Sequence, residues 1–161
     1  MMGRALLILG WLGTAGFVGS GVIGYWIDET PEWLGIHLLL GLVSILLVLF
    51  SHSWIMFYLI GTGKAIKTAV AEHSLDPDYA ERTKEFKNRS YPWLMGATGL
   101  TMATFILGGG VATGAVPAWL HHGLFLAATA AQVRSILLET SVLVANERLM
   151  GELNQRIGAS A

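Results

Sequence analysis

Residues 34–60 read LGIHLLLGLVSILLVLFSHSWIMFYLI and contain no aspartate, glutamate, lysine or arginine. About 20 consecutive apolar residues in a helix cross the hydrocarbon core of a bilayer, and this stretch is longer than that. Inside hydrocarbon the backbone must satisfy its own hydrogen bonds, which a helix does within one segment. The stretch therefore predicts a transmembrane α-helix.

Three other stretches have a similar character, at residues 5–27, 91–117 and 118–138. The chain is 53% hydrophobic and only 13% charged, which is more apolar surface than a soluble domain of 161 residues can bury. The connections at 28–33 and 114–118 are short and each contains a proline, so adjacent helices are expected to run in opposite directions. We therefore expect one all-α domain over residues 1–161, an antiparallel four-helix bundle in the membrane.

The basic residues orient this bundle. Six of the ten lysine and arginine residues lie in segment 62–90, and the two short turns contain none. Because basic residues stay on the cytoplasmic side, 62–90 is predicted to be a cytoplasmic loop, with both chain ends cytoplasmic, in a multi-pass protein of the cell inner membrane. The tryptophans fit this orientation, with Trp26, Trp33 and Trp119 at the outer boundary and Trp11, Trp54 and Trp93 toward the inner one.

Helical spacing of apolar residues continues past the second and fourth spans, through AIKTAVAEH (65–73) and SILLETSVLVANERLMGELNQR (135–156). These segments predict that helices 2 and 4 extend into a cytoplasmic helical cap, and Asp76 with Pro77 marks the start of a further helical segment. The first stretch is expected to be a retained span, because it is too long for a secretory signal and has no convincing cleavage site. No internal repeat is evident.

The absence of cysteine limits the chemistry. It excludes disulfides, iron–sulfur clusters, thiolate zinc sites, c-type haem and thiol nucleophiles, so a metal can bind only through histidine, methionine, carboxylate or backbone. No phosphate-binding loop, zinc-protease motif or di-iron motif is present. A net charge of −1 gives no reason to expect a nucleic-acid partner. We assign no catalytic residue.

Three histidines share one depth near the outer ends of the second and fourth spans: His37, His121 and His122. Ionisable groups at membrane depth are costly, so each is a hypothesis of function. At 100 degrees per residue His37 shares a face with Gly41, and His121 shares a face with Gln132 and Glu139. If the two faces meet, His37 and His121 converge in the outer half of the membrane.

Such a pair suits haem b, whose iron takes one imidazole from each of two helices. His37 and His121 are predicted as the metal ligands, with His122, Gly41 and Arg134 as further cofactor-binding residues. A copper or zinc site using the three histidines is the alternative cofactor. Alternatively, the histidines only bond helix ends and lipid headgroups. The many glycines of the first and third spans serve helix packing or leave room for a macrocycle.

A second polar layer lies near the inner end, where the same helical phase brings His52 toward Glu139. Imidazole and carboxylate exchange protons near neutral pH, so the two residues form a candidate proton or quinone site. A structural pair is the alternative, with Arg134 as a second partner for Glu139.

The leading hypothesis is a membrane haem b protein that transfers electrons between a quinone or a respiratory partner and an acceptor. A non-catalytic accessory subunit of a membrane complex, packed through its glycines against other chains or a copy of itself, is the alternative. A small transporter is a third possibility, although the spans carry few polar groups in their middles. Whether the chain is an enzyme is left open.

Overall fold

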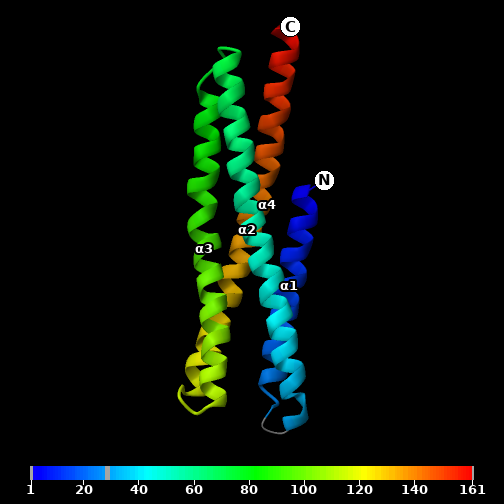
Figure 1. Ribbon diagram of the computed structural model, residues 1–161, viewed down its shortest axis with the longest axis vertical. Coiled ribbons are helices and arrows are strands. Elements are labelled where there is room, and N and C mark those ends of the chain that lie inside the picture. The colour runs from blue at the N-terminus through cyan, green and yellow to red at the C-terminus, as the bar shows by residue number, and fades with distance from the viewer. Residues whose placement is uncertain (1, 28–29, 161) are drawn as a thin grey trace.

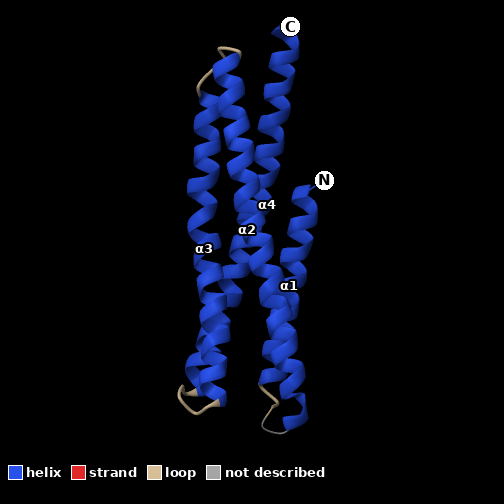
Figure 2. Ribbon diagram, viewed as in Figure 1, coloured by secondary structure: helices blue, strands red, loops and turns tan. Residues whose placement is uncertain are grey.

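The computed structural model describes residues 2–27 and 30–160, and within them the chain is helical almost throughout. Four α-helices and one short 3-10 helix follow one another: α1 Met2–Gly24, η1 Pro31–Trp33, α2 Leu34–Glu72, α3 Asp78–Ala112 and α4 Ala118–Ser160. Helices are the only regular elements in this part of the chain (Figure 2). The all-α class predicted from hydropathy is confirmed. Residues 28 and 29 of the predicted first turn lie outside the described residues.

Consecutive helices reverse direction along one long axis (Figure 1). The connections from α1 to α2 and from α3 to α4 lie at the same end, which we call the histidine end, because His37 and His121 lie close to it in the sequence. The connection from α2 to α3 lies at the other end, the hairpin end, together with the C-terminus. Helix α1 is the shortest and stops well before the hairpin end, so α2, α3 and α4 continue there without it.

The segment 62–90 is not a loop. Helix α2 continues to Glu72 and α3 begins at Asp78, so only residues 73–77 connect the two helices. We predicted cap extensions for helices 2 and 4, but α3 also extends toward the hairpin end and carries Pro92 in its interior. Charged residues at helical spacing are compatible with a solvated helix, and loss of apolar character alone does not end one.

The hairpin connection has a clear chemical cause. Pro77 precedes the first residue of α3, where its missing N–H costs nothing, and the Asp76 carboxylate accepts a hydrogen bond from the backbone N–H of Asp78 at 2.9 Å. Across the cap, Arg82 of α3 donates to Glu152 of α4 at 2.8 Å. This hydrogen bond lowers the pKa of the Glu152 carboxyl.

Glycines bring α1 into close contact with α2. A methyl group at Gly13 would lie 2.9 Å from the Ser44 carbonyl oxygen and 3.0 Å from the Val48 backbone nitrogen. Gly10 and Gly16 face Ser51 and Ser44 in the same way. Small residues on one face let two helix backbones approach, which provides packing where no hydrophobic effect acts between helices. The glycines of α1 therefore serve helix packing, one of the two roles expected from the sequence.

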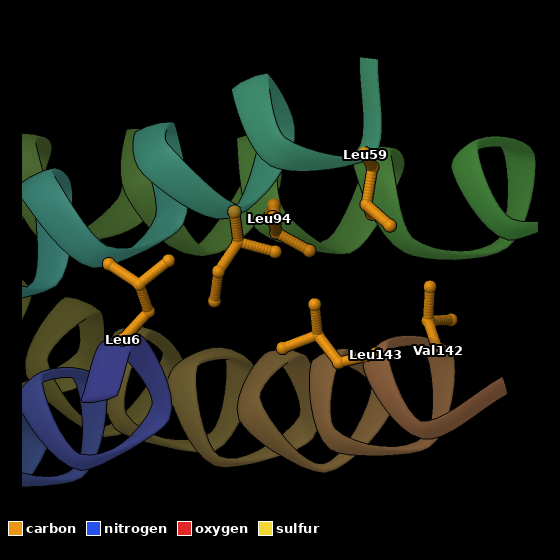
Figure 3. Packing of buried hydrophobic residues seen from close by; sticks show 6 residues of the cluster. Leu6, Leu59, Leu94, Val142 and Leu143 are labelled. Carbon is orange, nitrogen blue, oxygen red and sulfur yellow. The ribbon is translucent and has the colours of Figure 1, made fainter. Parts of the chain in front are cut away.

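Apolar clusters fill the interior between the helices. The largest includes Leu6 from α1, Leu59 from α2, Leu94 from α3 and Leu143 from α4, whose side chains converge from all four helices (Figure 3). A second cluster around Phe17, Ile45 and Ala128 lies toward the histidine end. A third holds the cap together. Apolar packing therefore occurs along the length of the molecule, in three separate clusters.

The exterior is as apolar as the interior. Many large apolar side chains are exposed on all four α-helices, and all six tryptophans are exposed, whereas several serine, threonine, glutamine, histidine and glutamate side chains are buried. Three helical segments are long and apolar enough to cross a membrane, Gly3–Gly24, Pro31–Glu72 and Asp78–Ala112. These properties indicate a membrane protein. The predicted span 118–138 is not among the three, and it is less apolar because it holds two histidines, Gln132 and Arg134.

The contact of α1 with α2 can be tested by adding one methyl group. Gly13→Ala should destabilise the folded protein by about 1–3 kcal/mol, because the new methyl meets backbone atoms that cannot move aside. Gly96→Ala is the matched control, since nothing lies within 4 Å of its added methyl, and it should be neutral or slightly stabilising. Unfolding by denaturing detergent measures both variants. Equal effects at the two positions would contradict the packing described here.

Candidate functional site

His37 of α2 is held against α1. Its Nδ1 donates to the Ser20 carbonyl oxygen at 2.8 Å, and the Ser20 hydroxyl donates to the His37 carbonyl oxygen at 2.8 Å. One turn after Ser20, Gly24 leaves the space for the ring, because a methyl there would lie 3.0 Å from the imidazole Cε1. The ring is partly buried. A hydroxyl, a carbonyl and a glycine of α1 thus fix the orientation of this imidazole.

His121 of α4 is held against α3 in the same manner. Its Nδ1 donates to the Thr104 carbonyl oxygen at 3.0 Å. One turn after Thr104, Gly108 faces the ring, and a methyl there would lie 3.0 Å from Cε1. This ring is also partly buried. Each imidazole is therefore held by the helix that precedes its own.

The two arrangements are equivalent along the chain. In both, the histidine bonds the carbonyl of a hydroxyl residue 17 positions earlier, and a glycine follows that residue by one turn. Ser20, Gly24 and His37 thus precede Thr104, Gly108 and His121 by one constant interval. The α1–α2 and α3–α4 helix pairs, two hairpins whose turns lie at the histidine end, therefore share a repeated structural unit. The unit is not evident in the sequence, because few other residues match at this interval.

The hydrogen bonds determine the tautomer of both imidazoles. A carbonyl oxygen only accepts, so Nδ1 must carry the proton in His37 and in His121. In a neutral imidazole Nε2 then has a free lone pair. Nε2 forms no hydrogen bond with the described residues in either ring. A histidine with Nδ1–H on a backbone carbonyl and Nε2 available has the arrangement of metal-binding histidines.

His37 and His121 are not in direct contact. Each ring packs within its own hairpin, although the electrostatic environment of His121 includes both His37 and His122. Helical phase predicted that the two rings would converge across the bundle, and the structure does not show this contact. Because each ring packs within its own hairpin, a ligand joining them must bridge the two hairpins.

His122 lies beside the first hairpin, with its ring 4.7 Å from the Tyr25 ring and 6.1 Å from the His121 ring between centroids. Residues 2–27 and 30–160 contain no group of three or more histidine, aspartate or glutamate side chains placed to hold a metal ion. The three histidines therefore do not form the three-imidazole cluster that the copper or zinc alternative requires.

The other two predicted cofactor residues lie elsewhere. Gly41 is buried against α1, where a methyl would come 3.0 Å from the Ser20 hydroxyl, so it serves the contact between α1 and α2. Arg134 is exposed and its guanidinium lies 5.5 Å from the centroid of the Trp93 ring. It does not pair with Glu139 in the structure, so its role as a second partner of that carboxylate is wrong.

The inner polar layer forms at the contact of α2 with α4. His52 Nδ1 and Glu139 Oε1 lie 2.5 Å apart, and the two side chains are 1% and 0% exposed. Two ionised groups are costly to remove from water, and mutual pairing offsets most of that cost. The imidazole and the carboxyl therefore form a hydrogen-bonded pair inside an apolar bundle.

Further buried polar groups lie on the same face of α4. Gln132 Nε2 donates to the Thr101 hydroxyl of α3 at 2.7 Å, and Ser135 is fully buried between Gln132 and Glu139 in the sequence. Toward the hairpin end, Asn146 accepts a hydrogen bond from the Thr62 hydroxyl at 3.2 Å. Their spacing of three, four and seven residues is that of one helix face.

Comparison with models of protein families, with curated proteins and with solved structures found no match to this chain. The chemistry of the site is therefore derived from its own residues.

The contribution of the buried pair to folding can be measured by a double-mutant cycle. Glu139→Leu alone should cost about 1–3 kcal/mol beyond packing effects, because His52 Nδ1 loses its partner at a fully buried site. His52→Leu together with Glu139→Leu should be less destabilising than the sum of the single variants. Detergent-induced unfolding provides the four free energies. Additive single effects would show that the two side chains do not interact.

Proposed function

We propose that the chain is a membrane haem b protein that transfers electrons, in which His37 and His121 would hold the iron. The observation that carries the proposal is the repeated histidine arrangement, in which two hairpins each present an imidazole with Nδ1 held and Nε2 available. Two such nitrogens from two helices are what the iron of haem b requires. A lone structural histidine needs only the Nδ1 bond and no counterpart in a second hairpin.

The surroundings of the two histidines are apolar, as a porphyrin requires. Next to them lies the cluster of Phe17, Ile45 and Ala128, with Leu100 and Phe125 packed against it, and these side chains would have to move to admit the macrocycle. When bound, haem b would supply a one-electron redox centre. Ser20 and Thr104 fix the ring orientation of the two histidines.

The proposal places all four helices in the membrane, α4 included. The part of α4 within 118–138 carries its polar groups Gln132 and Ser135 on a buried face, which supports its insertion as the least apolar of four spans. The basic residues of 62–90 then lie in the cytoplasm with both chain ends, and the histidine end lies at the outer surface. Quinone and a redox protein are the partners that this location suits.

The haem proposal predicts a coloured protein. Purified protein should carry one haem b per chain, with a Soret band that shifts on reduction, and His37→Ala or His121→Ala should abolish stable binding because iron loses an axial ligand. Absorption spectra and haem extraction measure this.

His73→Ala is the matched control, since His73 is exposed at the end of α2, and it should leave the spectrum unchanged. A colourless preparation that takes up no added haem would contradict the proposal.

The orientation can be tested because the chain has no cysteine. Ala115→Cys, in the exposed turn before α4, should react with an impermeant maleimide added to intact cells. Ser74→Cys, in the hairpin connection, should react only after the membrane is opened. The opposite pattern would reverse the proposed topology without affecting the haem ligands.

A second candidate function is that of an accessory subunit in a membrane complex or a homo-oligomer. Gly96 and Gly99 of α3 favour it, because nothing lies within 4 Å of a methyl added at either position. Helix glycines that no neighbour in the chain uses are suited to close packing with another helix. Haem-free protein whose oligomeric state changes in Gly96→Leu would favour this function over electron transfer.

A further inference from the structure

The interior of the bundle contains buried polar atoms that no protein group satisfies. Among the described residues, they are His52 Nε2, Glu139 Oε2, Ser135 Oγ, Gln132 Oε1 and Asn146 Nδ2. All five side chains are at most 1% exposed. Four of the five residues lie on one face of α4, and the fifth is in direct contact with Glu139. Their concentration along one helix face calls for a common ligand.

Water is the ligand that fits these atoms. A buried polar group without a partner is costly, and internal water molecules bind where two to four such groups converge. The amide and carboxylate oxygens accept hydrogen bonds, while the hydroxyl and the imidazole nitrogen can donate or accept, so water, which does both, can partner each of these atoms. A quinone headgroup fits less well, because His52 and Glu139 are closed off from outside and α2 would have to leave α4 to admit it.

Apolar layers bound the polar face on both sides. Toward the histidine end, Ser135 and Gln132 follow Glu139 at successive turns, Gln132 bonds Thr101 of α3, and the apolar cluster of Phe17, Ile45 and Ala128 lies beyond them. Toward the hairpin end, the next buried residues around the pair are Ile55, Leu59 and Val142, all apolar. Asn146 lies beyond this apolar layer, bonded to Thr62.

We propose that the His52–Glu139 pair is an internal proton-binding site, whose protons exchange with water bound beside Ser135, Gln132 and Thr101. A proton leaves the pair for the water beside Ser135, and one from that water replaces it. The apolar layer of Ile55, Leu59 and Val142 separates this site from Asn146 and Thr62 on the hairpin side.

Few other titratable groups face this site. Tyr58 of α2 and Tyr91 of α3 are partly buried against the adjacent apolar cluster, and the Tyr91 hydroxyl donates to the Met56 carbonyl oxygen at 2.9 Å. Leu6 and Leu7 of α1 contribute only apolar groups to the same cluster. The imidazole and the carboxyl are therefore the titratable groups of this site. The inference does not depend on haem, since none of these residues is a proposed iron ligand.

Infrared spectroscopy of the full chain in lipid nanodiscs, transferred from H2O to D2O, tests this exchange. The bands of the pair are identified as those that Glu139→Gln removes, whereas Glu147→Gln, an exposed glutamate on the same helix, leaves them in place. In the wild type these bands should shift on exchange. Ser135→Ala combined with Gln132→Leu should slow that shift about tenfold, because the bound water loses two partners.

Thr62→Val is the control on the opposite side of the apolar layer and should leave the exchange rate unchanged. Ser135→Thr, which keeps the hydroxyl, should restore fast exchange relative to Ser135→Ala. Thr101→Val replaces the double variant if that variant does not fold, and slower exchange is again expected. Bands that never shift, or exchange slowed by Thr62→Val and not by the changes at 135 and 132, would overturn the proposal.

Discussion

The structure depends on satisfying polar groups between helices whose outer faces are apolar. With leucine, isoleucine and phenylalanine on the surface, a polar side chain finds hydrogen-bond partners only inside the bundle. His37 finds one on α1, His121 on α3, and His52 on α4. These contacts are directional, whereas the apolar clusters around them tolerate sliding. The polar pairs therefore set the register of the helices, and the glycines allow the approach that the pairs need.

Two layers with different chemistry result from this constraint. At the histidine end each imidazole bonds a backbone carbonyl, which fixes the tautomer and leaves Nε2 for a ligand. In the inner layer the imidazole of His52 instead pairs with the carboxyl of Glu139. Thr104 and Thr101 lie one turn apart on α3 and connect the layers, since one bonds His121 and the other bonds Gln132. The redox centre and the proton-binding site proposed above would therefore lie in separate layers of one small bundle.

Hydropathy located the helices but not all of their ends. The first span was predicted to reach residue 27, because Tyr25, Trp26 and Ile27 are apolar, yet α1 ends at Gly24. The charged segment 62–90 was predicted to be a cytoplasmic loop with an extension of helix 2 and a further helical segment after Pro77, and in the structure that further segment is continuous with the third span in α3. Helical phase brought His52 and Glu139 together correctly, because the polar faces of α2 and α4 meet at the depth of these two residues. The same reasoning failed to find the partners of His37 and His121, which are backbone carbonyls and carry no signature in the side-chain pattern.

The sequence by itself determined the helical class, the apolar exterior and the faces on which the polar residues lie, because these depend on composition and on the fixed geometry of one helix. Only the tertiary structure decided which neighbouring helix each polar face meets. An α-helix in a bundle has more than one neighbour, and the choice depends on where a glycine such as Gly24 or Gly108 admits a ring. The repeated serine or threonine, glycine and histidine became recognisable as a unit once those contacts showed that the three residues act together.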